Sequence, residues 1–393
     1  MGLSDLHSLS PFDFHPRTRV VFGNDCIERL GELAREIGGS HALLVTDPGI
    51  EQCGHHDRAR KALEGAGLTL SLFDKVIQNP TTHEVEECVE FARSRNVDLL
   101  VGLGGGSSMD TAKGCNFLLT NGGKMEDYWG VGKATRPMLP MIAVPTTAGT
   151  GSECQSFALI SQAGTHRKMA CGDPKAAPRI ALLDPTLTLT QPKGVAACTG
   201  IDAVAHAVET AVTTKRNPIS RILSHEAFRL TESALPRVME NPDDLEARGA
   251  MLLGAALAGL AIENSMLGAA HAAANPLTAR FGVIHGQAVG LMLPKVVRFN
   301  GEDQSAREVY QELAQLAGVA RNGEPWADAV EALARLLEGF LRRAGLAESL
   351  TQLGIPESEI GDLAARATEE WTGKFNPREV TKEDFDSLYR MAY

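Results

Sequence analysis

The sequence has no excess of positive charge and no long run of strongly apolar residues. Its 393 residues include 38 Lys and Arg against 49 Asp and Glu, a formal net charge of -11. Without a basic stripe the chain cannot neutralise many phosphates, so neither nucleic acids nor anionic membranes are expected as partners. The apolar run 249–262 is too short and too rich in Ala and Gly to cross a bilayer.

Paired cysteines and a targeting leader are also missing. The seven cysteines are scattered, odd in number and never spaced C-x-x-C, which argues against a disulfide framework and a thiolate metal site. Residues 1–14 contain neither a basic leader nor an apolar stretch, so a cytoplasmic protein is expected. The apolar content of 44% is typical of a folded globular protein, and the length leaves room for two domains.

Apolar periodicity divides the chain into two parts. Short apolar runs alternate with helical stretches in the first part, which predicts a mainly parallel sheet covered by helices on both faces. The expected strands are 41–46, 69–73, 97–103, 141–144 and 180–183. Beyond Asp184-Pro185 the apolar spacing is three and four, which predicts helices only. We therefore expect an α/β dinucleotide-binding domain over 1–190 and an all-α domain over 191–393.

Two small-residue loops follow expected strands. The first, 102–113, contains three consecutive glycines and opens a helix, where free backbone N–H groups favour a pyrophosphate. Taken alone, it is equally typical of a tight turn with Ser107 or Ser108 as helix cap. The second, 144–153, combines hydroxyls and glycines. Because the carboxyl ends of parallel strands meet at one edge, both loops are expected at the same nucleotide crevice.

An acidic residue follows the first expected strand. The Asp47 carboxylate can accept a hydrogen bond from a ribose 2′-hydroxyl and would repel a 2′-phosphate. A helix or turn cap is the more common role of such an Asp.

Four residues from three segments form a candidate metal site. Asp202 and His206 lie four apart on one helical face, and His271 and His285 stand in Ala-rich, apolar surroundings. Taken alone, Asp202 and His206 are more typical of a helix cap and a buried core histidine. Together, one carboxylate and three imidazoles suit Fe(II) or Zn(II), with no thiolate to select zinc.

Over nearly its whole length the chain resembles the iron-containing, group III alcohol dehydrogenases. The resemblance is carried by motifs in the family's order: Asn79-Pro-Thr81, Gly104-Gly-Gly-Ser-Ser-x-Asp110, Pro145-Thr-Thr-Ala-Gly-Thr-Gly-Ser-Glu153, Lys168, Asp184-Pro185, Gly200-Ile-Asp-Ala-x-x-His-Ala-x-Glu209, and Gly268-x-x-His271 through His285-Gly286. It implies that the metal ligands are Asp202, His206, His271 and His285. It implies cofactor contacts at Asp47, Asn79, Gly105, Gly106, Ser107, Thr146, Thr147 and Lys168.

The implied activity is interconversion of a small primary alcohol and its aldehyde by hydride transfer to and from NAD(H), with a bound metal. A homodimer or a higher homo-oligomer is also implied. The chain departs from the family at Asn275, where many members have a second histidine after His271. An amide can orient a hydroxyl but cannot carry a proton, so we assign Asn275 an orienting role.

Three other functions fit parts of this pattern. A hydroxyacid-oxoacid transhydrogenase would keep its cofactor bound, and a non-catalytic nucleotide-binding module would need no metal. A lyase similar to dehydroquinate synthase would require several Lys and Arg around the metal for a phosphorylated acidic substrate. The segment 264–290 offers only Arg280, which disfavours the lyase.

Overall fold

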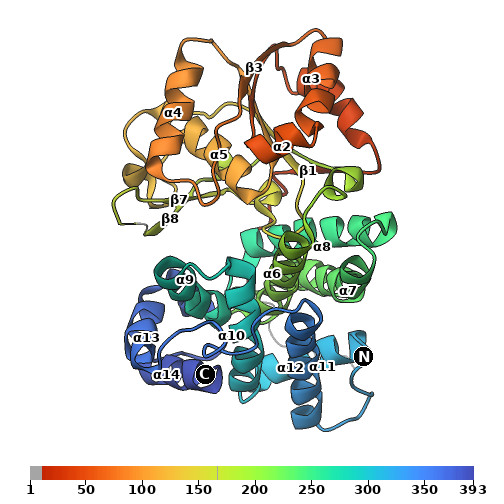
Figure 1. The fold of residues 1–393 in the computed structure, drawn as a ribbon, viewed down its shortest axis with the longest axis vertical. Coiled ribbons are helices and arrows are strands. Elements are labelled where there is room, and N and C mark those ends of the chain that lie inside the picture. Colours follow the sequence, from red (N-terminus) through yellow and green to blue (C-terminus); the bar gives the residue numbers. More distant parts are fainter. Residues whose placement is uncertain (1–10, 166) are drawn as a thin grey trace.

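The structure, a computed structural model, describes residues 11–165 and 167–393 (Figure 1). An α/β part formed by the first half of the chain stacks on a helical part formed by the second half. The first ten residues, which belong to the stretch that suggested a cytoplasmic protein, lie outside the described residues.

The α/β part is built on a six-stranded sheet of order β1-β9-β6-β4-β2-β3, in which every neighbouring pair is parallel. Its strands are β1 (Arg19–Phe22), β2 (His41–Val45), β3 (Thr69–Phe73), β4 (Leu99–Gly104), β6 (Met141–Pro145) and β9 (Ile180–Leu183). The five expected strands are confirmed to within two residues at their ends. β1 was not predicted, because this short edge strand has a single buried residue, Val21, and therefore a weak apolar signal.

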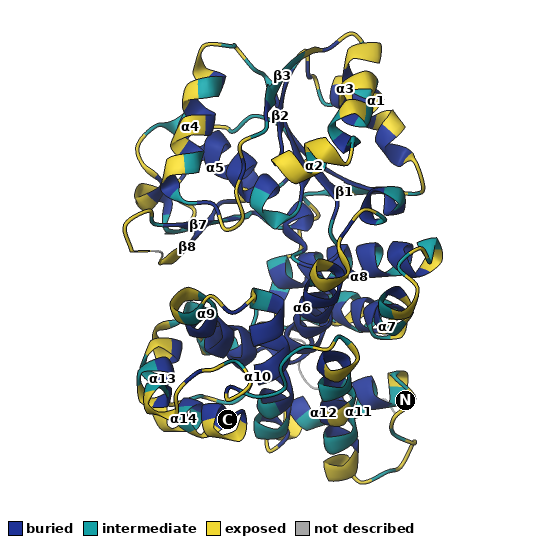
Figure 2. Ribbon diagram, in the orientation of Figure 1, coloured by how far each residue is buried: buried dark blue, intermediate teal, exposed yellow. Residues whose placement is uncertain are grey.

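Alternate residues of each strand pack into two separate cores. Leu43 and Val45 of β2 pack with α4 (Thr82–Arg93) and α5 (Gly106–Asn121). Ala42 and Leu44 pack with α1 (Leu30–Glu36) and α3 (His55–Gly65). Figure 2 shows the buried strands between helices whose outer faces are exposed. Both faces of the sheet are thus covered, as expected for parallel strands.

A second, three-stranded sheet was missed by the sequence analysis. Its order is β5-β8-β7, from β5 (Gly130–Val131), β8 (Lys168–Gly172) and β7 (Phe157–Ser161), with β7 and β8 antiparallel. The sequence analysis assigned a loop to 144–153 and made no prediction for the rest of the segment between β6 and β9, where five-residue strands give little periodicity. This hairpin brings Phe157 and Lys168 to the cleft described below.

Helices alone follow β9 in the described chain, as predicted. They are α6 (Lys193–Val212), α7 (Pro218–Glu240), α8 (Leu245–Ser265), α9 (Ala269–Phe281), α10 (His285–Asn300), α11 (Gln304–Leu316), α12 (Trp326–Arg343), α13 (Ile360–Glu369) and α14 (Lys382–Met391), with short 3-10 turns between some of them. By length and composition α6 and α8 could cross a membrane, yet 89% and 67% of their most apolar windows are buried inside this fold. They are core helices here.

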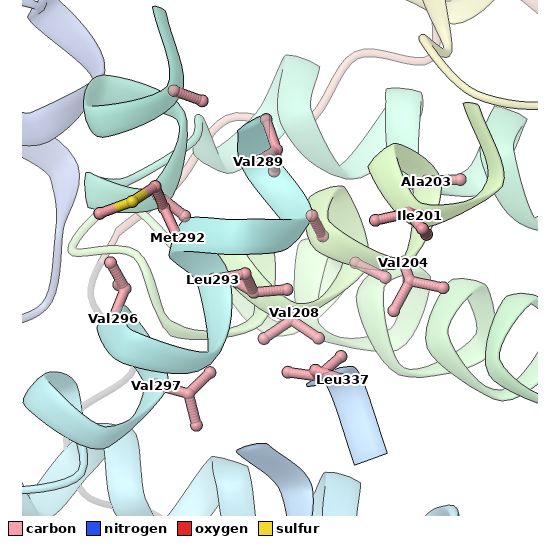
Figure 3. Packing of buried hydrophobic residues seen from close by; sticks show 14 of the residues in the cluster. Ile201, Ala203, Val204, Val208, Val289, Met292, Leu293, Val296, Val297 and Leu337 are labelled. Carbon is pink, nitrogen blue, oxygen red and sulfur yellow. The ribbon is translucent and has the colours of Figure 1, made fainter. Parts of the chain in front are cut away.

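Helices α6, α10 and α12 share one apolar core. Figure 3 shows Val208 of α6, Leu293 of α10 and Leu337 of α12 gathered at one place. Positions 202, 206 and 209 are spaced four and three apart, so their side chains share one face of α6. This face differs from the apolar face that packs against α10 and α12. The face that carries positions 202, 206 and 209 is turned toward the cleft between the two parts.

Candidate active site

A cavity of about 460 Å³ lies between the α/β part and the helical part, and both parts line it. The α/β part contributes the predicted cofactor residues Asn79, Gly105, Gly106, Ser107, Thr147 and Lys168. The helical part contributes all four predicted metal ligands and Asn275. Segments that are far apart in the sequence therefore meet at one site.

Three of the predicted ligands, all histidines, surround one carboxylate oxygen of the fourth, Asp202. Asp202 Oδ1 lies 3.5 Å from Nε2 of His206 and 3.4 Å from Nε2 of His271. The third imidazole, that of His285, places its Nε2 at 3.9 Å from the same oxygen. The rings of His206 and His271 are stacked, with centroids 4.8 Å apart.

These residues fit a divalent cation. Asp202 Oδ1 and His271 Nε2 are buried without a hydrogen-bond partner in the described chain, which is costly unless another group satisfies them. Ligand atoms of Asp202, His271 and His285 lie within 4.8 Å of one another. His206 is outside this closest group, although it lies beside the same carboxylate. Burial alone would raise the pKa of Asp202, but the attraction of its carboxylate to the facing imidazoles is larger, and the net pKa is lowered.

The buried carboxylate of Glu209 orients the imidazole of His271 through the ring nitrogen that does not face Asp202. Glu209 accepts hydrogen bonds from the backbone N–H of Ala270, at 2.7 Å, and from Nδ1 of His271. With the proton on Nδ1, Nε2 of His271 is left to face Asp202. Burial opposes the charged ring, yet Glu209 and Asp202 raise the pKa of His271 to about 9. The motif contained Glu209, and its helical spacing from His206 could have revealed this role, which the sequence analysis missed.

The glycine-rich turn forms the other end of the cavity. β4 ends at Gly104, Gly105 precedes α5, and α5 begins at Gly106, so free backbone N–H groups face an anion-binding position. A Cβ on Gly106 would lie 2.9 Å from Thr150, which shows how closely the second loop approaches. The backbone N–H of Asn79 donates to Ser107 Oγ at 3.2 Å.

Two predicted cofactor residues do not line the cavity. Asp47 caps α2 (Pro48–Gln52) through Gly49 and Ile50, and its second oxygen accepts from Ser108 Oγ at 3.3 Å. Thr146 is buried, and its N–H donates to Gly104 O at 3.0 Å. Both residues contact the glycine-rich turn on the side away from the cavity.

The sequence analysis missed two residues on the opposite wall. Asn275 Nδ2 donates to Glu370 Oε2 at 2.8 Å, and Trp371 stacks on Phe157 with centroids 5.7 Å apart. Glu370 and Trp371 follow α13 and line the cavity. No local pattern marks them, because only the packing of α9 against α13 brings them to the cleft.

The start of α10 tolerates no added side chain at Gly286. A Cβ there would lie 1.9 Å from the carbonyl oxygen of Cys198 on α6. We expect Gly286→Ala to lower the free energy of unfolding by roughly 1–3 kcal/mol or more, because backbone must move. It should also weaken metal binding, because the adjacent His285 is displaced. Urea unfolding followed by circular dichroism measures the first effect.

Gly194→Ala is the matched control, since it adds the same methyl group to α6 with no heavy atom within 4 Å. Its stability should be unchanged or higher by up to about 1 kcal/mol. Equal unfolding midpoints for the two variants would contradict the close approach of α6 and α10.

Known proteins resemble this chain along nearly its whole length. The model of the family "Iron-containing alcohol dehydrogenase" matches residues 16–185, and that of "Fe-containing alcohol dehydrogenase family, C-terminal" matches residues 196–393. The NAD-dependent methanol dehydrogenase of Bacillus methanolicus is 33% identical over 372 residues, which are 95% of this chain and 97% of that protein. The 1,3-propanediol dehydrogenase of Citrobacter freundii is 31% identical over 384 residues, covering 97% and 99%.

Solved structures share the fold. A 1,3-propanediol oxidoreductase superposes with a TM-score of 0.94 at 31% identity, covering 98% of this chain and 100% of its own. A sulfoacetaldehyde reductase from Bifidobacterium kashiwanohense, in complex with NAD+, has a TM-score of 0.87 at 29% identity, covering 98% and 99%. The chain therefore belongs to the iron-containing alcohol dehydrogenase family, whose fold it shares, and is an NAD(H)-linked oxidoreductase that interconverts alcohols and aldehydes.

Proposed function

We propose that this enzyme acts on a small primary alcohol and its aldehyde, with a divalent metal held by Asp202, His206, His271 and His285. The observation that carries the proposal is the buried Asp202 Oδ1, which has no hydrogen-bond partner in the described chain and faces three imidazole nitrogens at 3.4–3.9 Å. Fe(II) is the metal that the family suggests, and Zn(II) also suits this ligand set. When bound, such an ion stabilises negative charge on the substrate oxygen.

The chain's own residues bind and orient the reactants. Backbone N–H groups of Gly105, Gly106 and Ser107 are suited to the cofactor pyrophosphate, and Asn79, Thr147 and Lys168 line the same cavity. A related structure was solved in complex with NAD+, which supports NAD(H) as the cofactor. Phe157 and Trp371 stack at the substrate side, where they exclude water from the reacting carbon. We further propose that Thr146 and Asp47 help to bind the cofactor by holding the glycine-rich turn in position.

The charge of Asp47 should select NAD(H) over NADP(H). We expect Asp47→Asn to raise the ratio of kcat/KM for NADP+ to that for NAD+ by about tenfold or more. The reason is that nearby like charges repel by on the order of 1–4 kcal/mol, and 1.4 kcal/mol is about tenfold. Asn caps a helix as well as Asp does, so α2 should be preserved.

Asp57→Asn on α3 removes the same charge from an exposed position. It should leave the cofactor ratio unchanged. A ratio that stays at the wild-type value in both variants would show that Asp47 does not influence cofactor choice.

Removing and restoring the metal tests the proposed function directly. The purified enzyme is treated with a chelator, and NADH formation is followed with a panel of primary alcohols before and after adding Fe(II) or Zn(II) anaerobically. We expect activity to disappear and to return with about one metal ion per chain. Full activity in metal-free protein would refute the metal role, and NADH that never leaves the enzyme would indicate a transhydrogenase.

Three further proposals concern the whole protein. We place a domain boundary near residue 190, which is supported by the end of β9 at Leu183 and the start of α6 at Lys193. A cytoplasmic location is consistent with seven free cysteines. A homodimer or higher homo-oligomer is the assembly we expect, since closed symmetric oligomers are the commonest kind. Among the described residues that line the cavity, Lys168 is the single Lys or Arg, which disfavours a lyase for phosphorylated acids.

A further inference from the structure

Three carboxylates line the cavity within the described chain, namely Asp110, Asp202 and Glu370. Asp202 belongs to the proposed metal site. Asp110 already accepts from Ser152 Oγ at 2.7 Å and from the backbone N–H of Leu159 at 3.2 Å, so both of its oxygens are engaged. Glu370 is the remaining carboxylate, and its Oε1 accepts no hydrogen bond from a described residue, whereas its Oε2 does.

Asn275 holds Glu370 in place. Its Nδ2 donates to Glu370 Oε2 at 2.8 Å, and it lies one turn after His271 on α9. An amide is neutral and neither gains nor loses a proton near pH 7. Asn275 can therefore orient the carboxylate toward the cavity, but Glu370 is the member of the pair that can take up a proton.

Glu370 also lies where the reaction cavity meets a second cavity of about 810 Å³. This outer cavity shares Asn275, Lys168 and Glu370 with the first. It is also lined by exposed residues, including Glu369 and Arg280, and so opens to solvent. A proton taken up at Glu370 can therefore pass to water in the outer cavity.

The charges around Glu370 favour proton exchange. Burial raises the pKa of its carboxyl, while the Asn275 hydrogen bond and the positive charges of Arg167 and Lys168 lower it and Glu369 raises it. The net direction is upward. From α14, Tyr389 is the other titratable group that senses Glu370, and its own pKa is well above the usual range because of burial. A carboxylate with a raised pKa is a stronger proton acceptor near neutral pH.

We propose that Glu370 accepts the hydroxyl proton of the alcohol during oxidation and returns it during aldehyde reduction, with Asn275 as its positioning residue. This inference rests on the proposed function. The C–H bond breaks with its electron pair, which passes as hydride to NAD+ and reduces it to NADH. The O–H bond breaks, its proton goes to Glu370, and the alcohol becomes an aldehyde as the C=O bond forms. Glu370 then releases the proton to water in the outer cavity.

The test is single-turnover NADH formation by metal-loaded enzyme between pH 5 and pH 9, with a primary alcohol that the wild type oxidises. We expect Glu370→Gln to slow the step about 10²- to 10⁴-fold and to remove its rise with pH. Metal content and NADH affinity should be unchanged. Formate should restore part of the rate to Glu370→Ala in a concentration-dependent way, because it supplies the missing base. A purely structural role would give neither the lost pH dependence nor the rescue.

Glu369→Gln is the matched control, since this neighbouring carboxylate lines only the outer cavity. It should keep the pH-dependent rise of the rate, with the midpoint moved slightly downward, because Glu369 no longer raises the pKa of Glu370. If Glu370→Gln does not fold, Asn275→Asp tests the role of Glu370 instead. A second carboxylate next to Glu370 should raise its pKa and so move the pH midpoint of NADH formation upward.

An unchanged midpoint in Asn275→Asp, or a Glu370→Gln rate within twofold of wild type, would overturn the role of Glu370 alone. A wild-type enzyme that oxidises no primary alcohol would instead overturn the proposed function, and this inference with it.

Discussion

Replacing Asp202 by Asn should abolish metal binding and lower kcat by about 10³-fold. The substitution keeps the shape of the side chain but removes the negative charge that faces three imidazoles within 3.9 Å. A neutral amide would leave a divalent cation with imidazoles alone. Loss of an ion that stabilises developing charge costs several kcal/mol in the transition state, and each 1.36 kcal/mol is tenfold in rate. Elemental analysis and steady-state NADH formation measure the two effects.

Asp243→Asn provides the comparison, because it removes the same charge from an exposed loop of the helical part. Its metal content and kcat should equal those of the wild type. If Asp202→Asn still carried one metal ion per chain at wild-type turnover, the four residues would not form the metal site.

The second large effect is expected for Glu209→Gln, which should weaken metal binding about 10- to 100-fold. Glu209 accepts from Nδ1 of His271, so in the neutral ring the proton stays on Nδ1 and Nε2 can coordinate a metal. The amide of Gln can instead donate to Nδ1, which would place the ring proton on Nε2, where it blocks coordination. Competition with a chromophoric chelator gives the dissociation constant without reference to turnover.

Glu232→Gln is a suitable control, since Glu232 is a half-buried carboxylate on α7 outside the cavity. Its metal affinity should match the wild type. An affinity within about threefold of wild type in Glu209→Gln would mean that the tautomer of His271 is held by something else. Glu209→Asp adds a further comparison, because a shorter carboxylate keeps the charge but changes the contact with His271.

Local apolar periodicity was sufficient to predict the structure of segments in which a residue's neighbours in sequence are also its neighbours in space. Strands β2, β4, β6 and β9 are apolar runs buried on both faces, β3 is a partly exposed edge strand with alternating apolar residues, and the glycine-rich turn follows β4 directly. Asp202 and His206 share a helical face because they are four residues apart. By contrast, β1 has a single buried residue and gives a weak apolar signal, and the β7–β8 hairpin was not predicted although most of its residues are buried.

Position in the fold decided the roles of several other residues. Asp47 caps α2 and accepts from Ser108, because the chain turns into a helix immediately after β2. Glu370 and Trp371 carry no motif, and they reach the cleft because the segment after α13 packs against α9. Nothing within a few residues of Glu370 predicts its contact with Asn275.

The amino-acid sequence by itself determined the parallel sheet, the helical second half and the types of ligand available to a metal, because these depend on period and chemistry within short segments. Only the tertiary structure decided which groups meet. The imidazoles of α9 and α10 reach Asp202 because the apolar faces of α6 and α10 pack together, and Glu370 reaches Asn275 through α13. Such contacts depend on burial of side chains from distant segments, and that free energy is not encoded in any one stretch of the chain.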